Sequence, residues 1–327
     1  MNVVMMIGAG FSKAFSPHMP LMSELAPVAR KAVSRTYPVD RLTIPSCYMD
    51  DAELLMSYLH QEHPWKSQDI KLIEKACFVA ATSTICGYIT DAEEKAFEND
   101  LPDWLTSLIR LLDDTQCSVI TTNYDTVLER SAYLTLDIWT PNLHPVPLTN
   151  AWGRLGTAIL GGPPGDSFKL FKLHGSTNWY CTGQKGDPAV YYSTVSNRLP
   201  SLDHQQDRRS VVDLIPLIVP PVFDKSSWSS QSSLIDRVWH DAYDELLQAN
   251  QVCVLGCSFP DTDLPIRSLI SSACRHSSKI VHVANLNFDR IIRERYEKIF
   301  DGCKLGRVFE GPTAVEDLVN SLLAQSI

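Results

Sequence analysis

Short apolar runs rich in β-branched residues recur along this chain and alternate with segments of helical periodicity. These runs cover Val3–Ile7, Ser118–Thr122, Phe168–Leu173, Leu214–Val219, Val252–Leu255 and Ile280–Ala284. Several are bounded by Gly, Asn, Asp or Pro and lead into a helical pattern, which is typical of buried parallel strands in β-α-β units. The pattern predicts an α/β fold with a Rossmann-like, doubly wound, mostly parallel sheet.

The spacing of the helical segments predicts how the chain is organised. The last third alternates helices at 232–248, 262–275, 288–299 and 313–325 with strands at 251–257 and 279–285. Residues 40–114 contain only helical patterns, at 51–61, 67–98 and 102–112. We therefore expect a single domain over 1–327 that carries a helical insertion at 40–114. Residues 140–166 and 176–212 are rich in Pro, Gly, Asn and Ser, and are expected to form loops or small strands.

Composition narrows the classes of protein that fit. The 29 basic and 38 acidic residues give a net charge of −9, which argues against a nucleic-acid surface. The nine cysteines are scattered and form no Cys-x-x-Cys pair, so we expect reduced thiols and no zinc. His60 and His63 lack a clear third ligand, and no metal site is expected. No secretory signal and no apolar run of about 18 residues is present, which predicts a cytoplasmic protein without membrane contact.

The first apolar run ends in Gly8-Ala9-Gly10, with Ser12 two positions later. An apolar strand that stops at a Gly-x-Gly turn and restarts as a helix is how α/β proteins build a site for a dinucleotide pyrophosphate. The third glycine of the usual fingerprint would stand at position 13, which is Lys13, and this weakens a dehydrogenase interpretation. A purely structural turn is the alternative at this point.

Three further segments follow predicted strands and carry polar side chains. They are Thr121–Asp125, Lys172–Ser176 and Leu255–Phe259, the last with Asp261 and Asp263 just beyond it. In open α/β sheets, ligands lie outside the carboxyl ends of the strands, so the three segments are expected to face one crevice.

Each of these segments also fits a structural role when it is taken alone. Asn123 and Asp125 fit a helix cap, because both residue types satisfy the free N–H groups at a helix start. His174 fits an ordinary turn with Gly175, and Asp261 or Asp263 fits another cap. The order in which the segments occur along the chain favours the functional interpretation.

In that order, the motifs resemble the sirtuin superfamily. They are most similar to the sirtuin-like NAD-consuming domains of bacterial anti-phage defence systems, which share the GAG-F-S, T-N-Y-D and L-H-G-S segments. The resemblance covers residues 8 to about 287. It implies catalytic roles for Asn123 and His174, with Asp125 as a supporting group. It implies NAD contacts at Gly8, Ala9, Gly10, Phe11, Ser12 and Thr122, with the adenosine half lined by Gly256, Ser258 and Asn285.

The implied chemistry suits these residue types. Breaking the bond between nicotinamide and ribose builds oxocarbenium character at the anomeric carbon, and nicotinamide leaves as a neutral ring. The site then needs a base more than an acid. A histidine with a pKa near 6.5 can take a proton at neutral pH, and an asparagine carbonyl can orient water.

Two departures separate this chain from the deacetylases of the superfamily. Those enzymes carry a four-cysteine zinc module and a Gly-Ile-Pro-Asp-Phe-Arg loop, whereas this chain has Phe15–Leu21 at that place and no Cys-x-x-Cys. The resemblance therefore implies an NAD+ hydrolase, or NAD glycohydrolase, that uses NAD as its substrate. A non-catalytic module that senses NAD or ADP-ribose, an NAD-dependent deacylase and an ADP-ribosyltransferase remain alternatives.

An enzyme that destroys NAD would harm its own cell if it were always active. The resemblance therefore implies restraint by a homo-oligomer or by a partner such as a translocase ATPase or an Argonaute-like protein. The sequence has no P-loop and no nucleic-acid module, so direct nucleic-acid binding is not expected. The helical block 40–114 is the expected assembly surface.

Overall fold

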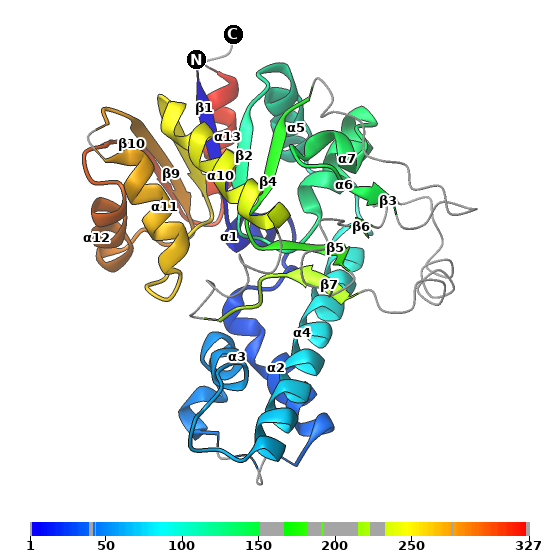
Figure 1. Cartoon of the computed structure of the whole chain (residues 1–327). Helices are drawn as coiled ribbons and strands as arrows, with labels where there is room; N and C mark the ends of the chain where they lie inside the picture. Colours follow the sequence, from blue (N-terminus) through cyan, green and yellow to red (C-terminus); the bar gives the residue numbers. More distant parts are fainter. Residues whose placement is uncertain are drawn as a thin grey trace.

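The structure is a computed structural model that describes residues 2–38, 42, 44–150, 167–181, 191–192, 215–222, 233–275 and 277–324. A parallel sheet flanked by helices forms the larger part, and a group of helices projects from the end at which the strands finish (Figure 1). The predicted loop residues 151–166, 182–190 and 193–212 lie outside the described residues.

Six strands form the main sheet. They are β1 (Val3–Ile7), β2 (Ser118–Thr121), β4 (Lys169–Lys172), β8 (Gln251–Leu255), β9 (Ile280–Asn285) and β10 (Lys304–Glu310), in the spatial order β10-β9-β8-β1-β2-β4. All neighbouring strands are parallel. From β1 the chain adds β2 and then β4 on one side. It then returns to the other side of β1 and adds β8, β9 and β10 in turn. The sheet is therefore doubly wound with its switch point between β1 and β8, and the predicted Rossmann-like α/β fold is confirmed.

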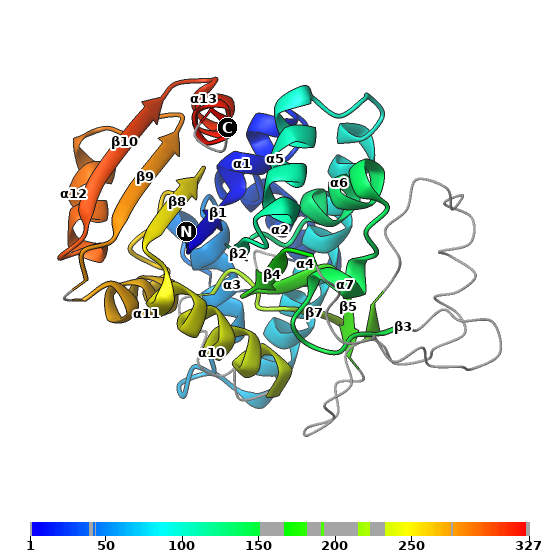
Figure 2. The same ribbon diagram turned by 90° about the horizontal axis from the view of Figure 1, so that it is seen from above.

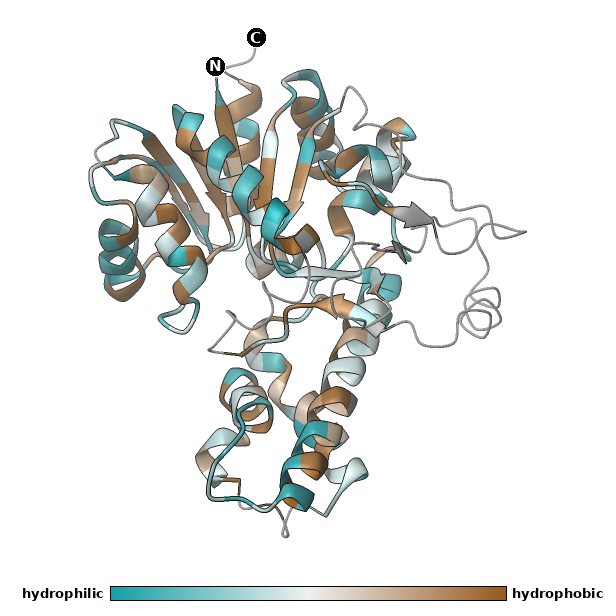
Figure 3. Cartoon of the chain, viewed as in Figure 1, coloured by the Kyte–Doolittle hydropathy of each residue, from teal (hydrophilic) through white to brown (hydrophobic). Residues whose placement is uncertain are grey.

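Side chains of the central strands alternate between two buried cores. On β1, Val4 and Met6 belong to one core and Met5 and Ile7 to the other. One face of the sheet is covered by α10 (Ser233–Gln248), α11 (Leu264–Cys274) and α12 (Arg290–Ile299). The other face is covered by α1 (Ala9–Phe15), α5 (Asp103–Asp114), α6 (Val127–Leu136) and α13 (Ala314–Leu323), as Figure 2 shows. Burial on both faces explains why the central strands are largely apolar, as the brown segments of the sheet in Figure 3 indicate.

A second, smaller sheet lies beside the carboxyl end of β4. Its strands are β3 (Thr149–Asn150), β6 (Tyr191–Tyr192), β5 (Gly175–Cys181) and β7 (Ile215–Ile218), in that spatial order, and a short helix, α7 (Thr140–Leu143), precedes it in the chain. The chain turns from β4 into β5 at Gly175, which has φ of +74°. A Cβ atom there would lie 2.1 Å from the Leu217 carbonyl oxygen, so this turn requires glycine.

Two strands differ from the sequence-based expectation. The run Leu214–Val219 was expected in the parallel sheet, but β7 pairs antiparallel with β5 in the second sheet. An apolar run does not reveal which sheet its strand joins. The edge strand β10 was not expected, because most of its residues are exposed and its register shifts between Leu305 and Val308. Such a strand lacks the apolar run that marks a buried one.

The projecting helices form a unit with its own core. This helical unit comprises the 3-10 helices η1 (Met22–Glu24) and η3 (Ser46–Tyr48) with α2 (Ala26–Thr36), α3 (Ala52–His60) and α4 (Gln68–Ala96). Its centre is built from Ala29, Val33, Leu55, Met56 and Ile85. In contrast, α5 packs against α6 and α13 beside the main sheet. Of the helices in the interval 40–114, α3 and α4 thus belong to the core of the helical unit and α5 belongs to a core of the main sheet. The helical unit also includes α2, which lies before that interval.

The long helix α4 is apolar enough to be compared with a membrane span. An 18-residue window of it has a mean hydropathy of 1.3, and by length and composition it is the helix among the described residues that could cross a membrane. Core helices of soluble proteins meet the same criterion. Here α4 packs against α2 and α3 and buries the carboxyl groups of Glu74 and Glu93.

Glu93 joins the helical unit to the main domain. Its carboxylate accepts hydrogen bonds from the backbone N–H and the hydroxyl of Thr126, which precedes α6, and lies 3.7 Å from Arg130. Burial, followed by the nearby charge of Asp125, raises the pKa of Glu93 from 4.5 to about 7. A carboxyl group on α4 therefore supports the segment that carries Asn123 and Asp125.

Three glycines let two strand-to-helix turns meet at the switch point. Gly8 N–H donates to Leu255 O at 3.0 Å, and Gly10 N–H donates to Gly256 O at 2.9 Å. A Cβ atom on Gly8 or Gly10 would lie 2.6 or 2.8 Å from the backbone of Gly256. Gly256 has φ of +66°, and its own Cβ would lie 2.2 Å from Phe11 N. The contact is between backbones and leaves no room for a side chain.

Gly256→Ala tests this contact, because the new methyl group meets backbone atoms and the residue must keep a left-handed φ. We expect a loss of at least about 2 kcal/mol of unfolding free energy in urea titrations. Gly87→Ala is the matched control, since a Cβ atom there meets nothing within 4 Å in the middle of α4. That variant should gain about 0.5–1 kcal/mol. Wild-type stability of Gly256→Ala would contradict the close approach.

The raised pKa of Glu93 predicts how stability depends on pH. Between about pH 4.5 and 7, the folded protein holds a proton on Glu93 that the unfolded chain has lost. This contribution is fully present below pH 4.5 and decreases as pH rises through 7, by about 3 kcal/mol in total. Urea titrations from pH 5 to 8 should show a smaller decrease for Glu93→Gln than for the wild type. Glu94→Gln, at the exposed neighbouring position, should follow the wild type; equal slopes for all three proteins would refute the prediction.

Candidate functional site

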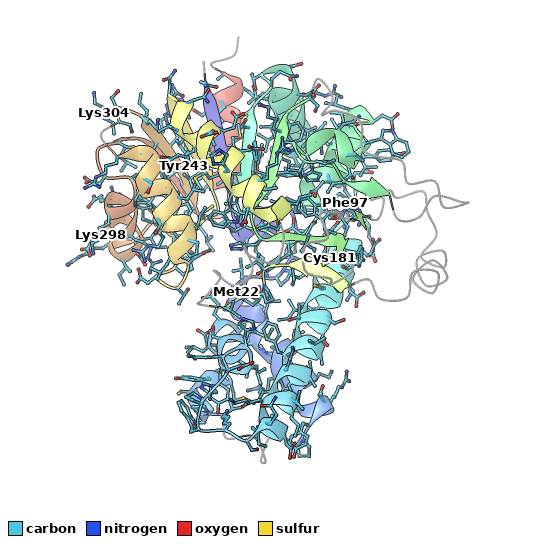
Figure 4. The ribbon with its side chains drawn as sticks, viewed as in Figure 1. Met22, Phe97, Cys181, Tyr243, Lys298 and Lys304 are labelled. Carbon is cyan, nitrogen blue, oxygen red and sulfur yellow. The ribbon has the colours of Figure 1, made fainter. Side chains whose placement is uncertain are left out.

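A cavity of about 670 Å³ lies at the carboxyl ends of the central strands, between the main sheet and the helical unit. Its size is within the range of about 300–1,000 Å³ that is usual for small-molecule and cofactor sites. The strand register brings Ile7, Thr121, Lys172 and Leu255 into one row, so the segments that follow these strands lie side by side. Met22 of the helical unit also lines the cavity and lies between the two parts in Figure 4.

Most of the predicted site residues line this one cavity. They are Gly8, Ala9, Gly10, Thr122, Asn123, Asp125, His174, Gly256, Ser258 and Asn285. Phe11 and Ser12 do not. The Phe11 ring is 1% exposed and packs edge-on against Trp104, with ring centroids 5.6 Å apart. Ser12 is also 1% exposed and lies beneath the cavity lining, where it contacts two other predicted residues.

Ser12 links Asn123 to Asp125. Asn123 Nδ2 donates to Ser12 Oγ at 3.0 Å, and Ser12 Oγ donates to Asp125 Oδ2 at 2.8 Å. The other carboxylate oxygen of Asp125 accepts from the Val127 N–H at 3.2 Å. This chain of bonds orients the Asn123 amide and leaves its carbonyl oxygen outside the chain. Burial raises the pKa of Asp125, while Lys172 and the Ser12 hydrogen bond oppose that rise.

The backbone around Asn123 is held from β1 and from β5 of the second sheet. Thr121 Oγ1 donates to Ile7 O at 2.8 Å and accepts the Asn123 N–H at 3.0 Å. The Tyr124 carbonyl oxygen accepts from the Thr177 N–H at 2.9 Å, at the start of β5. These bonds fix the segment between β1 and the second sheet, so the predicted catalytic asparagine stands on a rigid support.

A buried ion pair lies behind the same segment. Lys172 Nζ donates to the Asp125 carbonyl oxygen and to Glu129 Oε1, the latter at 3.1 Å. His144 lies 3.8 Å from Glu129, and burial followed by the charge of Lys172 lowers the pKa of His144 to about 3. His144 is therefore neutral at physiological pH. Lys172 thus binds Glu129 and the Asp125 carbonyl oxygen at the same time, which favours one arrangement of the Asp125 backbone.

His174 stands at the turn between β4 and β5. Its side chain is 5% exposed, and its carbonyl oxygen accepts from the Val219 N–H at 2.8 Å. The imidazole lies near the rings of Tyr124 and Trp239, and each of these rings has its centroid 6.2 Å away. Its Nε2 atom lies 4.0 Å from Asp263 Oδ1, a carboxylate that also lines the cavity.

The opposite end of the cavity is formed by the turn after β8 and by the end of β9. Asn285 Nδ2 donates to Cys257 O at 2.8 Å, and the Tyr296 hydroxyl donates to the same oxygen at 2.7 Å. Arg295 donates to Ser258 O at 2.9 Å. The three predicted residues of the adenosine half, Gly256, Ser258 and Asn285, thus lie together.

The glycine turn supplies fewer backbone donors than its motif implies. The Gly10 N–H is engaged by Gly256, and the Phe11 N–H donates to Gly8 O at 2.9 Å. Lys13 also lines the cavity and places positive charge near the turn. Its ammonium group lies 3.0 Å from Glu24 Oε2 and 3.1 Å from Pro17 O. Lys13 at the position of the third glycine is therefore part of the site.

Sequence reasoning did not assign two acidic groups of the cavity. Glu53 enters it from α3, and Asp263 enters it from the start of α11. No motif marks Glu53, which occupies one position in an otherwise apolar helix face. Asp263 follows a predicted strand, but an aspartate at that place equally fits a helix cap. Among the residues that the structure describes, no group of three His, Cys, Asp or Glu side chains could hold a metal ion, and the expectation of no zinc stays a prediction.

Comparison with known proteins identifies the family. A family profile described as SIR2-like domain matches residues 117–304. A search of curated proteins finds no match. Solved structures that the chain resembles include Sir2Tm bound to a propionylated peptide, at 12% identity and a TM-score of 0.43, over 99% of this chain and 92% of that one. A Sir2–p53 peptide–NAD+ structure is 14% identical with a TM-score of 0.42, and the match covers 100% of this chain and 93% of that one.

Sir2 bound to an acetylated peptide gives similar values, 14% identity and a TM-score of 0.42. The profile itself covers more than half of the 327 residues and includes the Asn123, His174 and Gly256 segments. The chain belongs to the family of SIR2-like domains.

Proposed function

We propose that this protein is an NAD+ hydrolase that cleaves the bond between nicotinamide and ribose to give nicotinamide and ADP-ribose. One observation carries the proposal: Asn123, Asp125 and His174 meet at one cavity whose other end is formed by the Gly8–Gly10 and Gly256 turns. Membership of the SIR2-like family supports a nucleotide substrate of this kind.

The cavity suits a dinucleotide in its shape and its polarity. It runs from the His174 end to the Asn285 end, and both apolar and polar groups line it. Lys13 lines the cavity beside the glycine turn, and its ammonium group would exchange Glu24 for an oxygen of the pyrophosphate. The adenosine half would lie near Ser258 and Asn285, and the nicotinamide ribose near Asn123 and His174.

The reaction needs a water molecule and a base. As the carbon–nitrogen bond breaks, its electron pair moves to the nicotinamide ring, which leaves uncharged, and positive charge develops on the ribose. The Asn123 carbonyl oxygen orients a water molecule at the anomeric carbon. His174 takes the proton of that water as the new carbon–oxygen bond forms. Asp125 acts through Ser12, by holding the Asn123 amide in the required orientation.

The proposal extends to regulation of the NAD-depleting activity. Following the resemblance to anti-phage defence domains, we propose a cytoplasmic effector that is restrained by assembly or by a partner such as a translocase ATPase or an Argonaute-like protein.

For the assembly itself, we propose that the partner is a second copy of this chain, which binds through the helical unit. The helical unit exposes Trp65, Leu72, Val79 and Tyr88 to 77%, 57%, 57% and 41%. Leu72 and Val79 are seven residues apart on α4 and so share one face.

Nicotinamide release from NAD+ tests the catalytic assignment. His174→Ala and Asn123→Ala should each lower the rate by at least about 100-fold, since each removes a group that acts on the reacting water. Ser12→Ala should lower the rate as well, with the cavity lining intact, because the Asn123 amide loses its hydrogen-bond acceptor. His240→Ala, at an exposed position on α10, is the matched control and should react like the wild type.

Folding of each variant is checked by circular dichroism. Full turnover in folded His174→Ala and Asn123→Ala would refute the site. Binding of NAD+ without nicotinamide release in any assembly state would favour a sensing module instead. Nicotinamide release that depends on an acetylated peptide would favour a deacylase.

The assembly proposal is tested by light scattering of the full chain. We expect a wild-type mass of at least two copies, and a lower mass for the double variant Leu72→Glu/Val79→Glu, because two carboxylates cannot be buried in an apolar interface without cost. Leu247→Glu, at an exposed leucine of α10, is the control and should keep the wild-type mass. A monomeric wild type, or an unchanged mass for the double variant, would contradict the proposal.

A further inference from the structure

Asp263 stands at the N-terminal cap of α11 but does not cap it. Its side chain makes no capping hydrogen bond to the helix. The equivalent aspartates of two other helices do cap: Asp51 accepts from Leu54 N–H and Asp289 accepts from Ile292 N–H, each at 2.9 Å. The usual structural reason for an aspartate at this position is therefore not fulfilled at α11.

The carboxylate of Asp263 points into the cavity instead. Asp263 is 7% exposed and lines the cavity, with Oδ1 4.0 Å from His174 Nε2. Asp261, two residues earlier, behaves differently: its side chain is 75% exposed and pairs with Arg267 and Arg295 on the surface. Burying a carboxylate costs free energy unless partners offset that cost, and a protonated His174 imidazole at this distance is one such partner.

We propose that Asp263 is a positioning residue for His174, holding the imidazole in place and stabilising the positive charge that it gains when it takes a proton. The inference rests on the proposed function, because a base that becomes an imidazolium is what NAD+ hydrolysis requires of His174. A carboxylate about 4 Å away in a largely buried site stabilises that cation much more than it would in water.

Among the residues that the structure describes, the other ionisable groups near His174 are either neutral or bound to other partners. Burial raises the pKa of Tyr124 well above 10, so its phenol is neutral, and burial likewise raises the pKa of the Cys257 thiol. Asp125 binds Ser12 and the Val127 N–H on the side of Asn123. The Lys172 ammonium group binds Glu129 and the Asp125 backbone.

Glu53 is the remaining acidic group at this end of the cavity, and it contacts the segment that carries Asp263. The Thr262 hydroxyl donates to the Glu53 carboxylate. Since Thr262 precedes Asp263 directly, α3 of the helical unit holds the loop from which Asp263 reaches His174. The position of the proposed residue thus depends on both parts of the molecule.

Asp263→Asn removes the charge and keeps the shape of the side chain. We expect the acidic limb of kcat/KM for nicotinamide release to move to lower pH by about one pH unit, because the imidazolium loses its stabilising partner. The plateau rate should fall by about tenfold or more. Asp263→Glu should restore the midpoint of the acidic limb. Asp261→Asn is the matched control and should keep the wild-type profile. Asp263→Ser repeats the test if the asparagine variant does not fold.

A second measurement separates this inference from the proposed function. The His174 imidazole is titrated by NMR in the full-length wild type and in Asp263→Asn, with the signal assigned by its loss in His174→Ala. We expect the pKa of His174 to be lower in Asp263→Asn by about one pH unit. An equal pKa in the two proteins, or equal pH profiles, would overturn the role of Asp263. Absence of nicotinamide release from the wild type would overturn the hydrolase, while the titration would still decide on Asp263.

Discussion

The contact between two backbone turns at the switch point of the sheet is the constraint on which the site depends. Gly8 and Gly10 meet Gly256 at distances that exclude any Cβ atom. Because β1 and β8 are neighbours, their two following turns must either separate or consist of glycine. The glycines let the turns touch, and together they form one end of the cavity. The G-A-G motif is therefore required for packing of the two turns, independently of any role in binding phosphate.

A chain of buried polar groups transmits this rigidity to the other end of the cavity. Ser12 lies one turn of α1 beyond Ala9 and holds Asn123, while Asp125 holds Ser12. Glu93 and Lys172 support the same segment from α4 and β4. Buried polar networks are costly when incomplete and favour one arrangement when complete. The helical unit is part of this network, because Glu93 of α4 binds Thr126 directly after Asp125.

The sequence predicted what depends on local pattern. Buried strands such as Val3–Ile7 are visible because both of their faces are apolar, and the polar segments after them had to meet once the sheet was parallel. Features that depend on residues far away in the sequence could not be predicted from local pattern. The edge strand β10 has no apolar run, and β7 looks like a parallel strand until its antiparallel partner is known. Ser12 was expected to contact the nucleotide, but its hydroxyl is engaged by Asn123 and Asp125, which are more than 100 positions away.

The folded unit extends beyond the region that matches the family profile. The family match begins at residue 117, yet the sheet inside that match is incomplete without β1, which separates β8 from β2. Removing residues 3–15 would leave unpaired edges in the centre of the sheet and expose both cores. It would also remove the turn against which Gly256 packs and the serine that orients Asn123. The first strand and helix therefore belong to the same cooperative unit as residues 117–304. Both segments line the cavity, so neither of them forms it alone.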